Sequence, residues 1–425
     1  MANPDTTQMT SVATRVAALC NVIQEHRRTG KAISGRRAAA ISAMIDDVAA
    51  TAAEGRPRAY RRKRRMANAR GYKQEGRRVG EGERGVVVRA RHRGTGQAVA
   101  VKSLHRRSGG SRASDVLREA CFTAAGGGHP SLVAFRTVAR APGTTDYSIV
   151  MDLHVGPSLR AVMADRDGRP FTEAEARRVM RQLLAGAEAM HRHGVVHRDI
   201  KPENIRVGAG AVNVKICNYG VAKSVAEKDP PQAFAGTMAY MAPEVLVKNA
   251  DHDTLADVWS LGCVMVEILT GKLPFVVAAK DEDDEASQLF KIFDVLGVPC
   301  KRVWEALKPQ VHDDKVQVWR ARQLRAGHGS RRRNRLRELV SEEILSGDGF
   351  QVLKGLLTCD PEKRLTAAAA LRCPWFTDNV DDDAVASERT TAVTMIAAVA
   401  SKPWSLATSF VRRALGLLQG LSCEC

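Results

Sequence analysis

The stretch that decides the fold is His197-Arg198-Asp199-Ile200-Lys201-Pro202-Glu203-Asn204. It places a carboxylate, an ammonium and an amide on one short segment at fixed spacings. A carboxylate can orient a hydroxyl group and accept its proton, an ammonium can pair with phosphate oxygens, and an amide oxygen can ligate a hard cation. The segment therefore predicts a loop that carries phosphoryl-transfer chemistry.

A glycine-rich segment precedes this loop, with Gly80, Gly82 and Gly85 at the spacing G-x-G-x-x-G. In dinucleotide-binding folds such glycines open a helix, whereas here Val86-Val87-Val88 follows and predicts a strand. The segment is therefore interpreted as a glycine hairpin that lies over phosphate groups. The backbone N–H groups of the hairpin would approach the phosphate oxygens. An ordinary hairpin turn remains the alternative.

A lysine closes the next apolar strand, Ala98-Val99-Ala100-Val101-Lys102. Such a lysine can contact phosphate oxygens if a carboxylate holds it, and Glu119 in the following helix is the candidate. A Lys/Glu pair taken alone is usually surface charge.

Composition and periodicity define the organisation. The chain has 425 residues, 44% hydrophobic and 26% charged, which is typical of a soluble globular protein. Strand patterns dominate to about residue 153, and helical patterns follow from about 172, where Val179, Leu183, Ala187 and Met190 recur at helical spacing. We expect an α+β fold with two lobes, a small antiparallel sheet with one helix and a larger, mainly helical lobe.

These motifs in this order resemble the eukaryotic serine/threonine protein kinases, over about residues 77–376. The family's later motifs are matched by Met241-Ala242-Pro243-Glu244, Asp257-Val258-Trp259-Ser260-Leu261-Gly262-Cys263, Phe293-Asp294-Val295-Leu296-Gly297-Val298-Pro299 and Asp360-Pro361-Glu362-Lys363-Arg364-Leu365-Thr366. The amino-acid sequence of these motifs is most similar to that of cyclin-dependent kinases of the plant F subgroup. The expected domains are an Ala/Arg-rich, partly disordered extension (1–76), a kinase domain (77–376, with lobes 77–153 and 154–376) and a tail (377–425).

The resemblance implies ATP and Mg²⁺ as cofactors and a role for each matched residue. Asp199 would orient the substrate hydroxyl, Lys201 would steady the γ-phosphate, and Asn204 would hold a metal ion. Thr237 would contact the catalytic loop, and Glu244 and Arg364 would form a buried ion pair. The nucleotide would be contacted or braced by Gly80, Gly82, Gly85, Val87, Ala100, Lys102, Glu119, Met151 as gatekeeper, and Asp152 and Leu153 in the hinge.

One position departs from the family's pattern. The metal-binding Asp-Phe-Gly reads Asn218-Tyr219-Gly220 here, so that a neutral amide replaces a carboxylate at the second metal position. Mg²⁺ prefers anionic oxygen ligands. Three interpretations stay open: a slow kinase, in which Mn²⁺ could serve better, a pseudokinase that binds nucleotide or partners, or a chance lesion in a redundant copy.

Two further departures concern regulation and partners. The activating threonine of the family, five residues before Thr237, is Gln232 here, and no Ser, Thr or Tyr lies between Ser224 and Thr237. Of the cyclin-contacting segment Ser114 to Glu119, only the Arg-Glu end resembles the family. A protein substrate is expected, and a cyclin or other regulatory protein is a weaker expectation.

Charge and targeting features are confined to the ends of the chain. Residues 1–78 carry +11 of the net charge of +18. The basic segment 56–65 predicts nuclear import or polyanion binding, with a soluble linker as the alternative, and it is the one place where nucleic acid is expected to bind. No apolar run is long enough to span a membrane, so a nuclear or cytoplasmic protein is expected. The ending Cys423-Glu424-Cys425 resembles prenylated tails, although two plain thiols are the simpler interpretation.

Overall fold

The computed structural model describes most of the chain between residues 4 and 377. The described ranges are 4–29, 33–53, 67–82, 84–105, 112–141, 146–154, 156–208, 213–227, 235–247, 253–276, 284–307, 316–317, 319 and 334–377. The basic segment 56–65, Gln232 and the tail with its terminal cysteines lie outside these ranges. No helix within them is both long and apolar enough to cross a bilayer.

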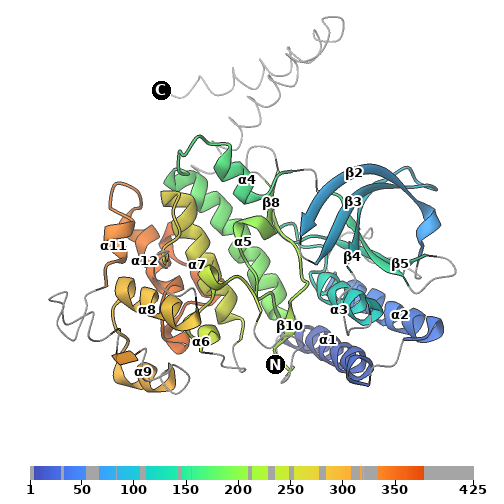
Figure 1. Ribbon diagram of the computed structural model, residues 1–425, viewed down its shortest axis with the longest axis horizontal. Helices are drawn as coiled ribbons and strands as arrows, with labels where there is room; N and C mark the ends of the chain where they lie inside the picture. Colours follow the sequence, from blue (N-terminus) through green and yellow to red (C-terminus); the bar gives the residue numbers. More distant parts are fainter. Residues whose placement is uncertain are drawn as a thin grey trace, which may run out of the picture.

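The small lobe is built on a six-stranded sheet in the order β1-β5-β6-β4-β3-β2 (Figure 1). Its strands are β1 (Ala67–Asn68), β2 (Tyr72–Gly82), β3 (Gly85–His92), β4 (Ala98–Leu104), β5 (Phe135–Arg140) and β6 (Tyr147–Asp152). All neighbours pair antiparallel except the two-residue β1, which pairs parallel with β5. The predicted antiparallel sheet is thus confirmed, with one short parallel addition.

Alternation along β4 explains which side chains face the ligand site. Val99 and Val101 pack into a small apolar cluster on one face of the sheet, whereas Ala100 and Leu104 join the main core on the other. Because strand side chains alternate between faces, Lys102 shares the face of Ala100. The lysine therefore points toward helix α3 rather than toward solvent, and it is buried.

Three helices accompany this sheet, α1 (Pro4–Arg28), α2 (Gly35–Ala52) and α3 (Arg112–Ala125). The kinase resemblance implies only α3, and the other two belong to the N-terminal extension. Figure 1 shows α1 on the side of α3 that faces away from the sheet and α2 beside α3, where it also contacts β5. Val12, Val16, Leu19 and Ile23 recur at spacings of four, three and four and form a buried stripe along α1. The described part of the N-terminal extension is therefore packed into the core of the protein.

The larger lobe is mainly helical, as predicted. Its helices are α4 (Leu159–Ala164), α5 (Glu173–Arg192), α6 (Pro243–Leu246), α7 (Leu255–Thr270), α8 (Glu285–Leu296), α9 (Lys301–Leu307), α11 (Leu336–Leu339), α12 (Gly347–Leu356), α13 (Ala367–Leu371) and α14 (Pro374–Thr377), and its short strands are β7 (Val195–Val196), β8 (Ile205–Val207), β9 (Val214–Ile216) and β10 (Lys223–Ser224). The predicted stripe of Val179, Leu183, Ala187 and Met190 is fully buried on α5. Thr172 and Glu175 form a capping box that begins this helix.

A buried ion pair joins α6 to the segment before α13. The Arg364 guanidinium donates to both carboxylate oxygens of Glu244, at 2.7 and 2.9 Å. It also donates to the carbonyl oxygens of Leu255 and Thr358. The predicted structural pair is confirmed, and its polar atoms are satisfied on both sides.

Arg364→Leu is expected to lower the free energy of unfolding by about 3–5 kcal/mol, because Glu244 would remain buried without its partner. Arg302→Leu is the matched control. Its side chain is 57% exposed in its pairs with Asp360 and Glu362, and we expect a loss below about 1 kcal/mol. Urea unfolding of both variants measures the difference, and equal losses would contradict the structural role.

Candidate functional site

A cleft of about 400 Å³ lies between the two lobes and gathers most of the predicted site residues. The predicted residues that line it are Gly80, Gly82, Gly85, Val87, Ala100, Lys102, Glu119, Met151, Asp152, Asp199, Lys201, Asn204 and Asn218. Leu153 is not among the lining residues and packs against the core instead. The structure therefore brings together side chains from the glycine hairpin, β4, α3, the end of β6 and the catalytic loop.

The glycine hairpin is a true β-hairpin, in which Gly82 pairs with Gly85 at the tip. A Cβ atom at Gly85 would lie 2.3 Å from the backbone oxygen of Ser103, so only glycine fits between β3 and β4 at that position. A helix does not follow the glycines, which excludes the dinucleotide-binding arrangement. The hairpin forms one wall of the cleft.

Lys102 is held from two sides inside the cleft. Its Nζ donates to Glu119 Oε1 at 2.5 Å and to Asn218 Oδ1 at 2.7 Å. Both Lys102 and Glu119 are buried, with side chains that are 7% and 4% exposed. The pair is therefore not a surface ion pair, and it joins β4, α3 and the segment around Asn218.

The catalytic loop is anchored by the buried carboxylate of Asp257 in α7. Its two oxygens accept from the backbone N–H groups of His197, at 2.8 Å, and Arg198, at 2.9 Å, and one also contacts His191 Nε2 at 2.9 Å. Arg198 has a φ of 68°, a backbone strain that these two bonds stabilise. Burial alone would raise the pKa of Asp257, but the hydrogen bonds from His191 and His197 outweigh it and lower the pKa.

The carboxylate of Asp199 has a fixed orientation. Oδ1 accepts from Thr237 Oγ1 at 2.8 Å, and Oδ2 accepts from Asn204 Nδ2 at 2.8 Å. Lys201 Nζ lies 3.3 Å from Oδ2 and donates to Thr237 Oγ1 at 2.5 Å. The predicted contact of Thr237 with the catalytic loop is confirmed, and the four groups form one hydrogen-bonded set.

Asn218 has a left-handed φ of 73°, and its amide is bonded at both ends. Oδ1 accepts from Lys102, and Nδ2 donates to Asn204 Oδ1 at 3.0 Å. Both predicted metal positions thus offer neutral amide oxygens that already accept hydrogen bonds. Within the described ranges, no group of three or more His, Cys, Asp or Glu side chains is placed to hold a metal ion. A hard cation would fit here only with phosphate oxygens supplying the negative charge.

The sequence analysis did not identify several residues that line the cleft, because only the folding of the chain brings them there. Arg84, at the hairpin tip, donates to the Gly220 carbonyl oxygen at 2.7 Å, and Arg206 of β8 donates to the Val79 carbonyl oxygen at 3.3 Å. Both arginines join the hairpin to the larger lobe. Val133 and Cys217 also line the cleft, and burial raises the pKa of the Cys217 thiol. No local pattern marks these four positions.

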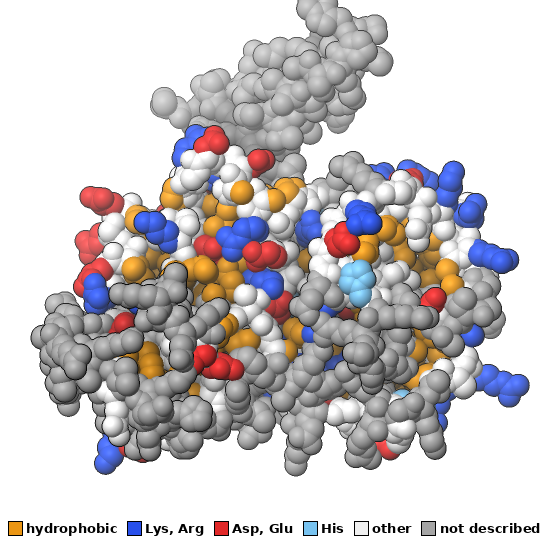
Figure 2. Space-filling model, viewed as in Figure 1, with side chains coloured by type: hydrophobic (Ala, Val, Ile, Leu, Met, Phe, Trp, Pro, Cys, Tyr) orange, Lys and Arg blue, Asp and Glu red, His pale blue; other side chains and the backbone are white. Residues whose placement is uncertain are grey.

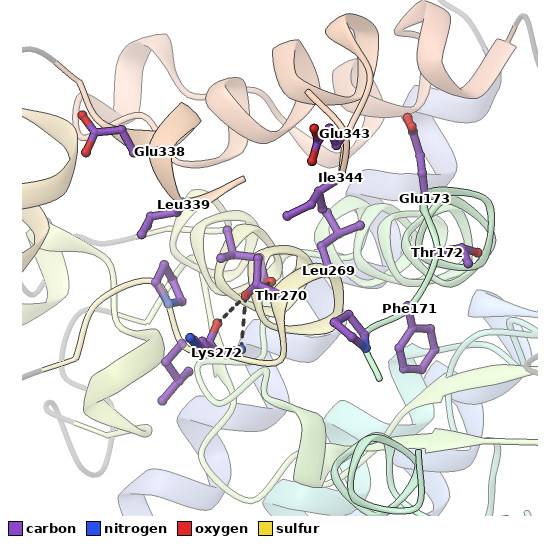
Figure 3. Close-up of a pocket in the computed structure, with 14 residues that line it drawn as sticks. Phe171, Thr172, Glu173, Leu269, Thr270, Lys272, Glu338, Leu339, Glu343 and Ile344 are labelled. Carbon is purple, nitrogen blue, oxygen red and sulfur yellow. Dashed lines mark hydrogen bonds between the residues drawn. The ribbon is translucent and has the colours of Figure 1, made fainter. Parts of the chain in front are cut away.

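A second pocket, of about 630 Å³, lies in the larger lobe and shares no lining residue with the cleft (Figure 3). It lies where the start of α5, the end of α7 and α11 meet. The Glu173 carboxylate on its rim accepts from Ser346 Oγ and Trp375 Nε1. This acidic group is therefore committed to structural bonds.

The basic side chains do not gather into a patch on the face shown in Figure 2. Among the described residues there, Lys and Arg stand apart along the rim of the small lobe, with polar and apolar surface between them. This face of the described structure offers no continuous track for a nucleic-acid backbone.

Comparisons with known proteins agree with this geometry. The protein kinase domain family matches residues 73–376. The chain is 43% identical over 306 residues to Putative cyclin-dependent kinase F-2 of Oryza sativa subsp. japonica, covering 71% of this chain and 88% of that protein. It is 33% identical over 311 residues to Cyclin-dependent kinase G1 of Arabidopsis thaliana, covering 70% of this chain and 48% of that protein. It is also 33% identical over 307 residues to Cell division control protein 2 homolog 3 of Trypanosoma brucei brucei, covering 71% of this chain and 90% of that protein.

The buried ring of His197 predicts a pH dependence of stability. Burial lowers its pKa below the usual 6.5. The ring nitrogens contact the Cys217 carbonyl oxygen and the Asp199 N–H, which fits a neutral ring with hydrogen on Nε2. Below a pH of about 6.5 the unfolded chain binds a proton that the folded chain does not, so stability falls as pH falls, by up to about 1.4 kcal/mol per pH unit.

Urea unfolding between pH 7.5 and 5 measures this slope. His197→Gln is expected to flatten it, whatever its effect on absolute stability, whereas His105→Gln, at an exposed position, should leave it unchanged. An unaltered slope in His197→Gln would assign the effect to other groups.

Proposed function

The chain belongs to the protein kinase family, with cyclin-dependent-kinase-like relatives, and from this premise we propose that it transfers the γ-phosphate of ATP to serine or threonine hydroxyls of protein substrates. The observation that carries the proposal is the hydrogen-bonded set around Asp199. A carboxylate fixed by Thr237 and Asn204 can orient an incoming hydroxyl and accept its proton.

Each further residue of the cleft has a role in this reaction. Lys102, braced by Glu119, would pair with the α- and β-phosphates, and Lys201 would pair with the γ-phosphate. The glycine hairpin would cover the phosphates with backbone N–H groups. Met151 and Asp152, at the end of β6, would flank the adenine together with Val87 and Ala100.

Asn204 and Asn218 would hold the metal ion that accompanies ATP. When bound, Mg²⁺ would supply positive charge that offsets the phosphate charge during transfer. Neither amide contributes a negative charge, so most of the anionic ligands would come from the nucleotide. If the missing carboxylate costs the transition state about 4 kcal/mol, turnover falls roughly a thousandfold. A slow kinase, in which Mn²⁺ could replace Mg²⁺, is the form of the proposal that these residues support.

A non-catalytic nucleotide- or partner-binding module is the second candidate. The bond from Asn218 Nδ2 to Asn204 Oδ1 favours it. The N–H hydrogen of Asn218 already satisfies the oxygen of Asn204 that would otherwise be free to bind a cation. Such a site is satisfied without metal. Nucleotide could then bind through Lys102 and the glycine hairpin with no transfer.

Partners are proposed from the relatives, and location from the sequence. Protein substrates are proposed from the family, and a cyclin partner is the alternative that only the relatives' names suggest. The proposed nuclear or cytoplasmic location rests on the basic segment 56–65 of the sequence.

Radiolabelled transfer from ATP to a generic basic protein and to the chain itself tests the proposal. It is run with Mg²⁺ and with Mn²⁺ on the native chain, on Asn218→Asp and on Asp199→Asn. We expect native transfer above the Asp199→Asn background and a rise of about a thousandfold or less in Asn218→Asp, because the variant restores an anionic metal ligand.

The outcomes separate the two candidates. Transfer by Asn218→Asp but not by the native chain would identify a pseudokinase that one amide has disabled. No transfer by either, with ATP binding retained, would contradict the kinase proposal and leave the binding module.

A further inference from the structure

Helix α3 is buried on every side. All its side chains from 116 to 125 are buried, although a helix that covers one face of a sheet normally keeps its outer face in water. The inner face packs on β4, β5 and β6, and the outer face packs on α1 and α2. The chain's own N-terminal helices therefore occupy the surface of α3 that the sheet does not cover (Figure 1).

The contact between α1 and α3 is close. The buried thiols of Cys20 in α1 and Cys121 in α3 face each other, and this proximity together with burial raises the pKa of Cys121 well above its usual value. Arg15 of α1 pairs with Asp47 of α2 and donates to Thr51, which joins the two outer helices. The three helices thus form one packed layer.

The end of α2 is fitted just as closely. Gly127, directly after α3, has a φ of 56°, and a Cβ atom there would lie 2.4 Å from the Ala52 carbonyl oxygen. Only glycine permits this approach. The loop after α3 is therefore shaped to receive α2.

The position of α3 decides whether the cleft is complete, because α3 carries Glu119, whose carboxylate holds Lys102. We propose that α1 and α2 act as a built-in activating subunit, covering the outer face of α3 and holding Glu119 against Lys102, so that no separate protein is needed on that face. The inference rests on the proposed nucleotide site. Its readouts are nucleotide affinity and hydrogen exchange, which do not require phosphoryl transfer.

Truncation of one buried leucine in α1 tests this brace. Leu19→Ala is compared with Leu353→Ala in α12, which removes the same atoms from an equally buried site in the other lobe. Leu19→Ala should speed amide exchange in α3 about tenfold relative to α5. It should also weaken ATP binding about fivefold, because coupling between sites is typically of this size. Leu353→Ala should change both by less than about twofold.

Two additions keep the test decisive. Val16→Ala removes less volume and replaces Leu19→Ala if that variant does not fold, and Ala18→Asp, on the exposed face of α1, should behave as the native chain. Equal exchange in the Leu19 and Leu353 variants would overturn the proposal. So would a cyclin that binds the native chain and further protects α3, because the outer face would then be open to a partner.

A second observation concerns the segment after Asn218. Glu227 is buried, and its two carboxylate oxygens accept from Arg118 Nη1 and Nη2, each at 2.7 Å. Arg118 Nη2 also donates to the Ala222 carbonyl oxygen at 3.0 Å. Because Arg118 precedes Glu119 in α3, this bidentate pair fixes the segment after Asn218 to the helix that completes the cleft.

A second arginine lies near the same carboxylate. Burial and the charge of Arg118 lower the pKa of Arg198 to about 10, and the charge of Glu227 opposes that shift. The carboxylate of Glu227, bonded to Arg118, therefore offsets the repulsion between the arginines of α3 and of the catalytic loop. In regulated loops the negative group is often a phosphate added to Ser, Thr or Tyr.

This chain has no such acceptor available among its described residues in the segment. Tyr219 and Ser224 are buried, and the Thr237 hydroxyl donates to Asp199. The sequence between Ser224 and Thr237 contains no Ser, Thr or Tyr. We infer that Glu227 permanently supplies the negative charge that a phosphate would supply, and that it positions α3 and residues 219–227 without modification.

Phosphatase treatment and Glu227→Gln test this inference together. Phosphatase should change transfer by the native chain, or by Asn218→Asp if the native chain is inactive, by less than about twofold. Glu227→Gln should lower it about tenfold through loss of a charge-assisted pair, and Glu227→Asp should recover part of the loss. Glu305→Gln, at an exposed position, is the charge-matched control.

Amide exchange in residues 213–227 gives a readout that does not depend on transfer. It should rise in Glu227→Gln and stay constant in Glu305→Gln. A large loss of activity after phosphatase treatment, or a Gln variant indistinguishable from the control, would overturn the inference.

Discussion

The buried ammonium of Lys102 is the constraint on which the rest of the cleft depends. A cation in the interior must be neutralised, and here Glu119 supplies one carboxylate while Asn218 supplies a neutral oxygen. The three side chains come from β4, α3 and the segment after β9. The charge of one lysine therefore sets the relative position of the sheet, the helix and the segment around Asn218.

Helix α3 connects the buried Lys102–Glu119 pair to two other parts of the chain. Glu119 faces the cleft, Arg118 pairs with Glu227 in the segment after Asn218, and Cys121 contacts Cys20 of α1. Three side chains that point in different directions from one short helix thus each contact a different part of the chain. Displacement of the helix would break a buried ion pair on two sides and expose apolar surface on the third, so its observed position is strongly preferred.

Local patterns predicted the two-lobed fold and the residues around Asp199, because fixed spacings and strand alternation are properties of neighbouring residues. They missed Arg84 and Arg206, which enter the cleft only when the lobes meet. They also missed the docking of the N-terminal helices. A weak helical period runs from Val12 to Val22, but the apolar stripe does not show which surface it covers. The role of Glu227 was equally hidden, since its partner lies 109 residues away in sequence.

Charge balance explains why Asn218 is compatible with an intact cleft that holds no cation. With Asn at 218, the buried group of Lys102 and Glu119 is neutral, and the amide donates its own hydrogen to Asn204. With Asp at 218, the site would carry one uncompensated negative charge and two facing acceptors, an arrangement that requires a cation. An Asp carboxylate at 218 would thus stabilise the site with a bound cation and destabilise the site without one. The Asn amide stabilises the site without a cation. A stable cleft with every catalytic-loop side chain in place is therefore what this substitution should produce, whether the chain transfers phosphate slowly or only binds nucleotide.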